Sequence, residues 1–199
     1  FISFQPSEFA NLALIVYIAD FITRKEDKIK ILTTGFIPAM SMLAVVVLLI
    51  LLQPDLGTII ALSSVVLIML FVGGVRGRYI LSLILCSLPV LYFLVFSVPY
   101  RRARILAFIN PWLDPKGTGF QIIQSQIAIG SGGLFGRGLG HSQQKLFYLP
   151  AAHTDFIFSI IGEELGLLGT LGVIALFMIF IQQGLKIIKN AQDRFGYFL

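Results

Sequence analysis

The stretch ILTTGFIPAMSMLAVVVLLILL (31–52) contains no charged residue. A helix needs about 20 mostly apolar residues to cross the hydrocarbon core of a bilayer, so this stretch predicts a membrane span. Three further stretches of similar length are uncharged or nearly uncharged: 56–75, 79–99 and 156–183. A fifth, 6–22, is shorter and carries two acids. The sequence therefore predicts an all-α fold, a polytopic transmembrane helix bundle.

The composition supports this prediction. Hydrophobic residues make up 57% of the chain and charged residues 13%, whereas a soluble domain is about half apolar and about a quarter charged. The single cysteine, Cys86, excludes an internal disulfide framework. Pro38 and Pro89 fall inside predicted spans, where neighbouring helices tolerate kinks. Because the sequence begins with Phe1 rather than Met, we expect a piece of a longer chain.

Basic residues set the predicted orientation. TRKEDKIK (23–30), VRGR (75–78) and the tail after Gln183 carry Lys and Arg, while the turn QPD (53–55) carries none. If the spans alternate, the basic segments share one side, which the positive-inside rule makes cytoplasmic. Segment 100–154 is then a large extracytoplasmic loop. The net charge of +5 reflects this topology and contact with anionic membrane lipids, and nothing indicates nucleic acid.

The outer loop 100–154 is too long for a simple connector, so we expect it to carry function. It opens with YRRARI, which contains Arg101, Arg102 and Arg104. These arginines suit either a solvated helix end or guanidinium recognition of a phosphate or carboxylate. The stretch IIQSQIAIG (122–130) is amphipathic and predicts a short helix at the membrane surface.

The outer loop continues with GSGGLFGRGLG (130–140), in which six of eleven residues are glycine. Such a density lets the backbone approach a ligand or another segment closely. No GKS or GKT follows, so a nucleotide-binding P-loop is disfavoured, and a flexible re-entrant turn is the alternative.

The end of the loop contains HSQQKLFYLP (141–150) and HTDFIF (153–158). Two histidines, His141 and His153, are too few for a metal site made by protein alone. Binding of a divalent cation that is shared with a substrate phosphate is an alternative that stays open.

Asp155 precedes a long apolar run, where an acid either caps the helix or acts as a general base.

Three further acids lie at or inside predicted spans. Glu163 and Glu164 fall about two helical turns inward, and ionisable groups at such depth are candidates for a functional site. One of them is expected to pair with a basic or polar group on another span. Asp55, in QPDLGT, is either a helix cap or part of the site.

Five segments in collinear order resemble the SEDS family (FtsW, RodA and SpoVE), and the FtsW/SpoVE branch most. They are QPSEF (5–9), QPDLGT (53–58), AIGSGGLFGRGLGHSQQKLFYLP (128–150), HTDFIF (153–158) and GEELGLLG (162–169). The resemblance implies ten spans in the whole protein, of which this chain would supply the fourth through eighth. Residues 1–199 would thus be part of a single membrane domain.

The resemblance implies a peptidoglycan glycosyltransferase that polymerises lipid II during cell division and releases undecaprenyl diphosphate. Asp155 matches the family's essential acid and would be the catalytic base. Expected substrate-binding residues are Arg101, Arg102, Arg104, Lys145, His153, Gln121 and Ser142, with Mg²⁺ or Mn²⁺ as a candidate companion of the diphosphate. Glu163, Glu164, Asp55 and Glu8 are expected to be structural or supporting.

The resemblance also implies a location and partners. The expected location is the bacterial inner membrane at the division septum. The expected partners are a class B penicillin-binding protein that acts as a transpeptidase, and other divisome membrane proteins. Two alternatives stay open: a lipid II flippase that uses Glu163 and Glu164 as its polar path, and a non-catalytic scaffold.

Two positions depart from the family pattern. Ala151 stands where the family usually has glutamate after Leu-Pro, and this departure puts full activity in doubt. Asn11 stands where a lysine is common, which removes a charge partner for Glu8.

Overall fold

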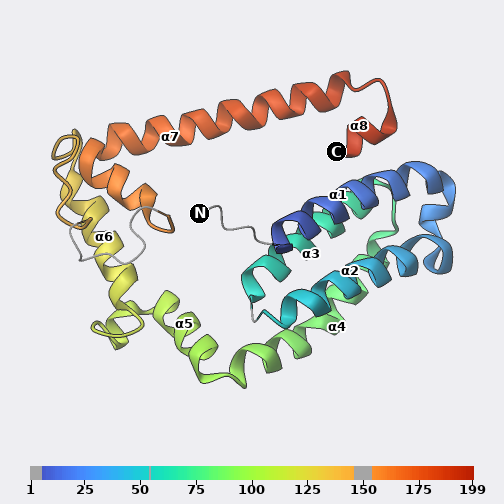
Figure 1. Cartoon of the computed structure of the whole chain (residues 1–199), viewed down its shortest axis with the longest axis horizontal. Coiled ribbons are helices and arrows are strands. Elements are labelled where there is room, and N and C mark those ends of the chain that lie inside the picture. The colour runs from blue at the N-terminus through green and yellow to red at the C-terminus, as the bar shows by residue number, and fades with distance from the viewer. Residues whose placement is uncertain (1–5, 54, 146–153) are drawn as a thin grey trace. The chain divides into compact units, whose positions relative to one another are not determined.

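The computed structural model describes residues 6–53, 55–145 and 154–199 (Figure 1). These residues form helices and connecting turns with no strand among them, which confirms the predicted all-α fold. The longer helices are α1 (Pro6–Lys25), α2 (Ile37–Leu51), α3 (Leu56–Val72), α4 (Gly77–Phe96), α5 (Pro99–Ile109), α6 (Phe120–Gly132) and α7 (Ile157–Asn190). The shorter ones are η1 (Glu26–Lys30), η2 (Leu32–Phe36), η3 (Pro111–Leu113) and α8 (Arg194–Phe198).

All five predicted spans are helical, as α1, α2 with η2, α3, α4 and α7. In the described part of the chain, three helical segments are long and apolar enough to cross a membrane: 32–51, 77–96 and 157–190. Helix α3 is equally apolar but has 17 residues, the lower limit for a span. Helix α1 is less apolar, so its role as a span stays a prediction. The prolines act differently, because Pro38 lies in the first turn of α2 whereas Pro89 lies inside α4.

The chain divides into two compact units, and the prediction of a single domain stays a prediction. The first unit comprises residues 1–89 and 185–199, and the second comprises 90–184. In the first unit, α1, α2 and α3 pack on one another around an apolar core. Ile18, Val66 and Leu70 are completely buried there. In a lipid environment such packing holds helices together chiefly through van der Waals contact.

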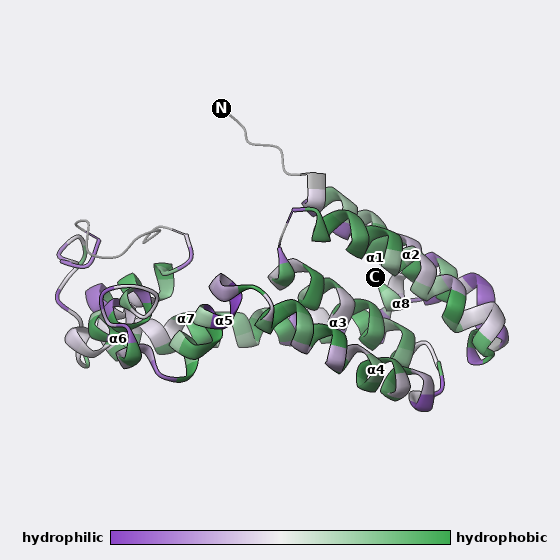
Figure 2. Ribbon diagram, turned by 90° about the horizontal axis from the view of Figure 1, so that it is seen from below, coloured by the Kyte–Doolittle hydropathy of each residue, from purple (hydrophilic) through white to green (hydrophobic). Residues whose placement is uncertain are grey.

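Large apolar side chains also cover much of the outer surface. Helix α4 has no buried residue, although its sequence is as apolar as that of a membrane span. Figure 2 shows hydrophobic residues along most of α3 and α4, with hydrophilic residues gathered near helix ends. An apolar exterior of this kind is unfavourable in water and is typical of a surface that faces lipid or other spans.

The basic segments of the first unit meet at one end of it. Residues from the end of α1 and from η1, the end of α3 and α8 line one pocket there, among them Lys30, Gly73 and Arg194. Arg194 Nη1 lies 3.0 Å from Glu26 Oε1. This meeting agrees with the prediction that these segments share one side of the membrane.

Asp55 caps helix α3. Its Oδ1 accepts a hydrogen bond from the backbone N–H of Thr58 (3.2 Å), and its Oδ2 accepts one from the Thr58 hydroxyl (2.6 Å). These two bonds hold the pKa of the Asp55 carboxyl below its usual value. Of the two interpretations of Asp55, the structure therefore shows the helix cap.

Removing this cap has a predictable cost. Asp55→Ala is expected to lower the free energy of unfolding of the intact protein in detergent by about 1 kcal/mol. Because the folded-state pKa is lowered, the charged cap stabilises above the unfolded pKa of about 3.9 and is lost as pH falls through the folded value. Thermal unfolding between pH 7 and pH 3 measures both effects.

Asp55→Asn is the matched control, because Asn is also a good N-cap residue but does not titrate. It should keep most of the stability at pH 7 and reduce the loss at low pH. If Asp55→Ala unfolds at the wild-type temperature at every pH, the cap contributes nothing to the folded protein.

The second unit contains most of the outer loop. Helix α5 follows α4 and is separated from α6 by η3, whose first turn is capped by Asn110 through the backbone N–H of Trp112 (3.2 Å). The next turn is held by Asp114, which accepts bonds from the N–H groups of Gly117 and Thr118. Helix α6 confirms the predicted short helix and buries Ile123 and Ala128.

Candidate functional site

Helix α7 is broken at Gly166. This residue has φ 67° and ψ −159°, inside a helix that otherwise runs from Ile157 to Asn190. That combination is essentially restricted to glycine, because any side chain would crowd the backbone. The break interrupts the hydrogen bonds that would normally run along the helix at this point.

The glycine-rich part of the outer loop replaces those hydrogen bonds. In an unbroken helix the N–H groups of Leu167 and Leu168 would donate to the carbonyls of Glu163 and Glu164. Here the two N–H groups donate instead to the loop carbonyls of residues 133 and 134, at 2.9 and 3.3 Å. The carbonyls of Glu163 and Glu164 accept from the N–H groups of residues 137 and 138, both at 3.0 Å. The loop thus satisfies the backbone groups that the kink exposes.

Glycines make this close approach possible. A Cβ atom on Gly132 would collide with the carbonyl oxygen of Gly162, and one on Gly136 would collide with that of Glu164. Gly136 also has a positive φ of 80°. Of the two uses that the sequence offered for these glycines, approach to a ligand or to another segment, the structure shows the second.

The side chain of Glu163 is completely buried and accepts four hydrogen bonds from the same loop. The donors are the hydroxyl of Ser142 (2.6 Å), the backbone N–H groups of Gln143 (3.1 Å) and Gln144 (3.3 Å), and Nη1 of Arg137 (3.3 Å). A buried carboxylate is costly unless its lone pairs are satisfied, and four donors satisfy them.

Glu164 binds the loop through other groups. Its Oε1 lies 2.7 Å from Nζ of Lys145 and accepts a longer bond from the backbone N–H of Ser142 (3.4 Å). We call the two glutamates and their donors in 137–145 the carboxylate anchor. The prediction that one of the glutamates pairs with a group on another span is wrong, because the outer loop supplies the partners of both. Ser142 and Lys145, predicted to bind substrate, are engaged in the anchor.

The two neighbouring glutamates should respond differently to loss of charge. In Glu163→Gln the amide nitrogen must face hydrogen-bond donors in a buried site, so we expect the free energy of unfolding to fall by about 2–3 kcal/mol. In Glu164→Gln the freed ammonium of Lys145 can reach water, and we expect a loss of about 1 kcal/mol. Thermal unfolding of the intact protein in detergent measures both.

The two variants are matched controls for one another, because each removes one negative charge at adjacent positions. Equal losses would show that burial of Glu163 does not distinguish the two sites. A loss in Glu164→Gln larger than that in Glu163→Gln would contradict the geometry of the anchor.

Asp155 lies in the turn directly before α7 and is exposed. Within the described residues no hydrogen bond reaches its carboxylate. The first backbone hydrogen bonds of the helix run instead to the carbonyl of Phe156, from the N–H groups of Ser159 and Ile160. The structure therefore leaves this carboxylate accessible. Its neighbour His153 and the departure at Ala151 lie outside the described residues.

The three predicted arginines lie on α5. Nη1 of Arg101 donates to the carbonyl of Leu94 (2.9 Å), and the guanidinium of Arg104 lies over the ring of Tyr100 with its carbon 5.1 Å from the centroid. Arg102 is exposed. Gln121 is exposed in the first turn of α6. In the described part of the chain no hydrogen bond or ion pair joins these residues to Asp155, so their roles in substrate binding stay predictions.

The N-terminal end of α1 carries Glu8 and the remaining departure from the family pattern, Asn11. Glu8 is exposed there, where an acid interacts favourably with the helix dipole. The Oδ1 atom of Asn11 is buried without a hydrogen-bond partner in the structure. A supporting role for Glu8 stays a prediction.

Potential metal ligands are dispersed over the part of the chain that the structure describes. Among the described residues, no three His, Cys, Asp or Glu side chains lie close enough to hold an ion. The divalent cation expected alongside a substrate diphosphate stays a prediction.

Sequence reasoning missed four members of the site: Arg137, Gln143, Gln144 and Gly166. The signal for Arg137 was present, since a basic residue within a glycine-rich loop complements two acids in a neighbouring apolar segment. Gly166 looks like the other glycines of GEELGLLG, and only its backbone angles distinguish it.

Span-length apolar helices, clustered basic segments and a polar loop anchored on a helix define this molecule as a polytopic membrane protein. The model of the cell cycle protein family of FtsW, RodA and SpoVE matches residues 1–199. The chain belongs to this family.

Relatives cover nearly the whole chain. A probable peptidoglycan glycosyltransferase FtsW of Geobacter sulfurreducens is 53% identical over 197 residues, which are 99% of this chain and 53% of that protein. Stage V sporulation protein E of Bacillus subtilis is 46% identical over 197 residues, 99% of this chain and 54% of that protein. The chain thus spans about half the length of the curated relatives it matches.

The fold is also similar to that of a protein of solved structure. A chain from a peptidoglycan synthase complex, in which polymerization and crosslinking are coordinated, is 31% identical, with a TM-score of 0.72. The match covers 99% of this chain and 54% of that chain. The similarity agrees with the resemblance that the sequence motifs indicated.

Proposed function

We propose that the whole protein is a peptidoglycan glycosyltransferase that polymerises lipid II into glycan strands during cell division. The observation that carries this proposal is the 53% identity, over 99% of the chain, to a relative named for that activity. The exposed carboxylate of Asp155, placed between the anchored loop and α7, provides a base that a substrate can reach.

In the proposed reaction, the 4-hydroxyl of the acceptor sugar attacks the anomeric carbon of the donor. The bond from that carbon to the diphosphate oxygen breaks, and undecaprenyl diphosphate leaves with the electron pair. Asp155 accepts the proton of the attacking hydroxyl. Cationic groups stabilise the leaving diphosphate, and the α5 arginines are better candidates than Lys145, which is paired with Glu164.

The proposal includes a location and a partner. We place the whole protein in the bacterial inner membrane at the division septum, with segment 100–154 on the outer side. Its proposed partners are a class B penicillin-binding protein with transpeptidase activity and other divisome proteins. Support comes from the similar chain in a complex that coordinates polymerization with crosslinking.

The flippase alternative relied on Glu163 and Glu164 as a polar path through the membrane. Glu163 is buried with four donors, and Glu164 is bound to Lys145. Carboxylates occupied in this way by the protein's own loop are poorly placed to bind a moving cargo. The geometry therefore favours the polymerase over the transporter.

The test uses the intact protein, purified with its transpeptidase partner and supplied with labelled lipid II. Formation of glycan strands that a muramidase degrades supports the proposal. In a parallel experiment, intact protein in vesicles is given lipid II on one leaflet. Transfer of lipid II between leaflets without polymer would identify a transporter. Absence of both transfer and polymerisation would indicate a non-catalytic scaffold.

A further inference from the structure

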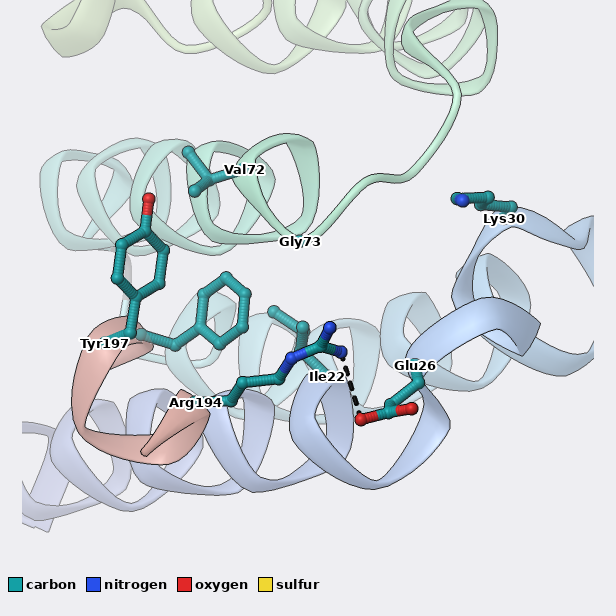
Figure 3. A pocket seen from close by; sticks show the side chains of 8 residues that line it. Ile22, Glu26, Lys30, Val72, Gly73, Arg194 and Tyr197 are labelled. Carbon is teal, nitrogen blue, oxygen red and sulfur yellow. Dashed lines mark ion pairs between the residues drawn. The ribbon is translucent and has the colours of Figure 1, made fainter. Parts of the chain in front are cut away.

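The first unit contains a cavity of about 400 Å³ that the proposed chemistry does not use. Its walls come from three parts of the chain: the end of α1 with η1, the end of α3, and α8 (Figure 3). Its apolar lining consists of Ile22, Val72 and Phe198. Its polar groups belong to Glu26, Lys30, Arg194 and Tyr197. This combination suits a ligand with a charged head and an apolar body.

The charge around the cavity is positive. Segments 20–30, 73–78 and 193–194 meet at this end of the unit and contain seven Lys or Arg residues against four Asp or Glu. The positive-inside rule places the same segments at the cytoplasmic face of the membrane. Anionic lipids are enriched in such a leaflet, and basic pockets between helices there recognise their head groups.

Arg194 is the main candidate for contact with a phosphate. It pairs with Glu26 at 3.0 Å, but both side chains are more than half exposed, so the pair is weak and readily exchanged. A guanidinium has five N–H donors, which suits it to bind a phosphate. Figure 3 shows Arg194 and Tyr197 on α8 at one side of the cavity and Lys30 on η1 at another.

We propose that this cavity binds the phosphate head group of an anionic membrane lipid from the cytoplasmic leaflet, with an acyl chain against its apolar lining residues. Arg194 contacts the phosphate, the positive charge of Lys30 attracts it from another side of the cavity, and Glu26 opposes it. The site is independent of the glycosyltransferase proposal, because it uses none of the residues assigned to that reaction.

The test measures binding of short-chain phosphatidylglycerol to the intact protein in detergent, with phosphatidylcholine of the same chain length as the comparison. Arg194→Gln and Lys30→Gln are each expected to weaken phosphatidylglycerol binding about fivefold. Glu26→Gln should strengthen it, because the competing carboxylate is lost. Arg24→Gln is the matched control, since Arg24 pairs with Asp20 and does not line the cavity.

The opposite signs expected for Arg194 and Glu26 separate binding from a structural role. If their ion pair served only to hold α8, both Arg194→Gln and Glu26→Gln would weaken binding, and the proposal would fail. An equal effect of Arg24→Gln would indicate attraction to the surface as a whole. Equal binding of phosphatidylcholine would exclude recognition of the anionic head group. Soluble glycerol phosphate that binds as tightly as the lipid would overturn the assignment to a membrane lipid.

Discussion

Asp155→Asn is expected to lower the rate of glycan strand formation by the intact protein by at least about 100-fold. Asparagine keeps the size of the side chain but cannot accept the proton of the attacking hydroxyl. The carboxylate of Asp155 is exposed, and no hydrogen bond from a described residue engages it. Loss of this carboxylate should therefore lower the rate of polymerisation, with little change in the free energy of unfolding. Polymerisation of labelled lipid II in the presence of the transpeptidase partner measures the effect.

The control for this variant is Asp114→Asn. Asp114 is another exposed acid of the outer loop, and its bonds hold only a local turn at Gly117 and Thr118. It should retain most of the activity. Undiminished polymer in Asp155→Asn would remove the assignment of this residue as a base.

Ala151→Glu belongs in the same experiment, since it restores the residue that the family usually has after Leu-Pro. If the starting protein is inactive, Asp155→Asn is tested in the Ala151→Glu background. More polymer from Ala151→Glu would identify Ala151 as the cause of low activity, and equal polymer would make it a tolerated difference.

Gly166→Ala is expected to destabilise the intact protein by about 4 kcal/mol, the largest effect on stability that we predict. The backbone of Gly166 lies in a region that disfavours any side chain. A Cβ atom there would also collide with the backbone nitrogen of Gly136 and lie 2.7 Å from the carbonyl of Leu134. Relief of the collision would straighten α7 and break the hydrogen bonds that join it to the loop.

Thermal unfolding in detergent measures this loss, with Gly172→Ala as the matched control. Gly172 lies in the same helix, and a Cβ atom there would have nothing within 4 Å. Alanine at that position should be neutral or stabilising, by up to about 1 kcal/mol, because glycine is unfavourable within a helix. Equal unfolding temperatures for both variants would mean that α7 is not broken at Gly166.

The helices could be predicted because their signal is local. The uncharged run 79–99 became α4, which ends at Phe96, and Pro99 begins the next helix. A stretch of about 20 residues without charge indicates a helix that can cross a bilayer. This pattern can be recognised without knowledge of distant parts of the chain. The short surface helix α6 was predictable for the same reason, from its own amphipathic pattern.

The carboxylate anchor could be predicted only in part. Acids at positions 163 and 164 are conspicuous in an apolar segment, so their importance was visible in the sequence. Their partners were not, because Ser142 and Lys145 lie about twenty residues away and no periodicity links them. Polar side chains in an outer loop look available for substrate until a long-range fold shows that they are already bound.

The kink at Gly166 also changes the depth at which α7 can begin to cross the membrane. Residues 167–190 would rise about 36 Å as a helix, more than the hydrocarbon thickness of about 30 Å. The part of α7 that follows Gly166 is thus sufficient to span the bilayer by itself. The turn with Glu163 and Glu164 can then lie at head-group level, where Arg137 and Lys145 stay hydrated. That is also the level of the diphosphate in the proposed lipid-linked substrate, so hydrophobic matching after the kink would hold the carboxylate anchor at the depth of that group.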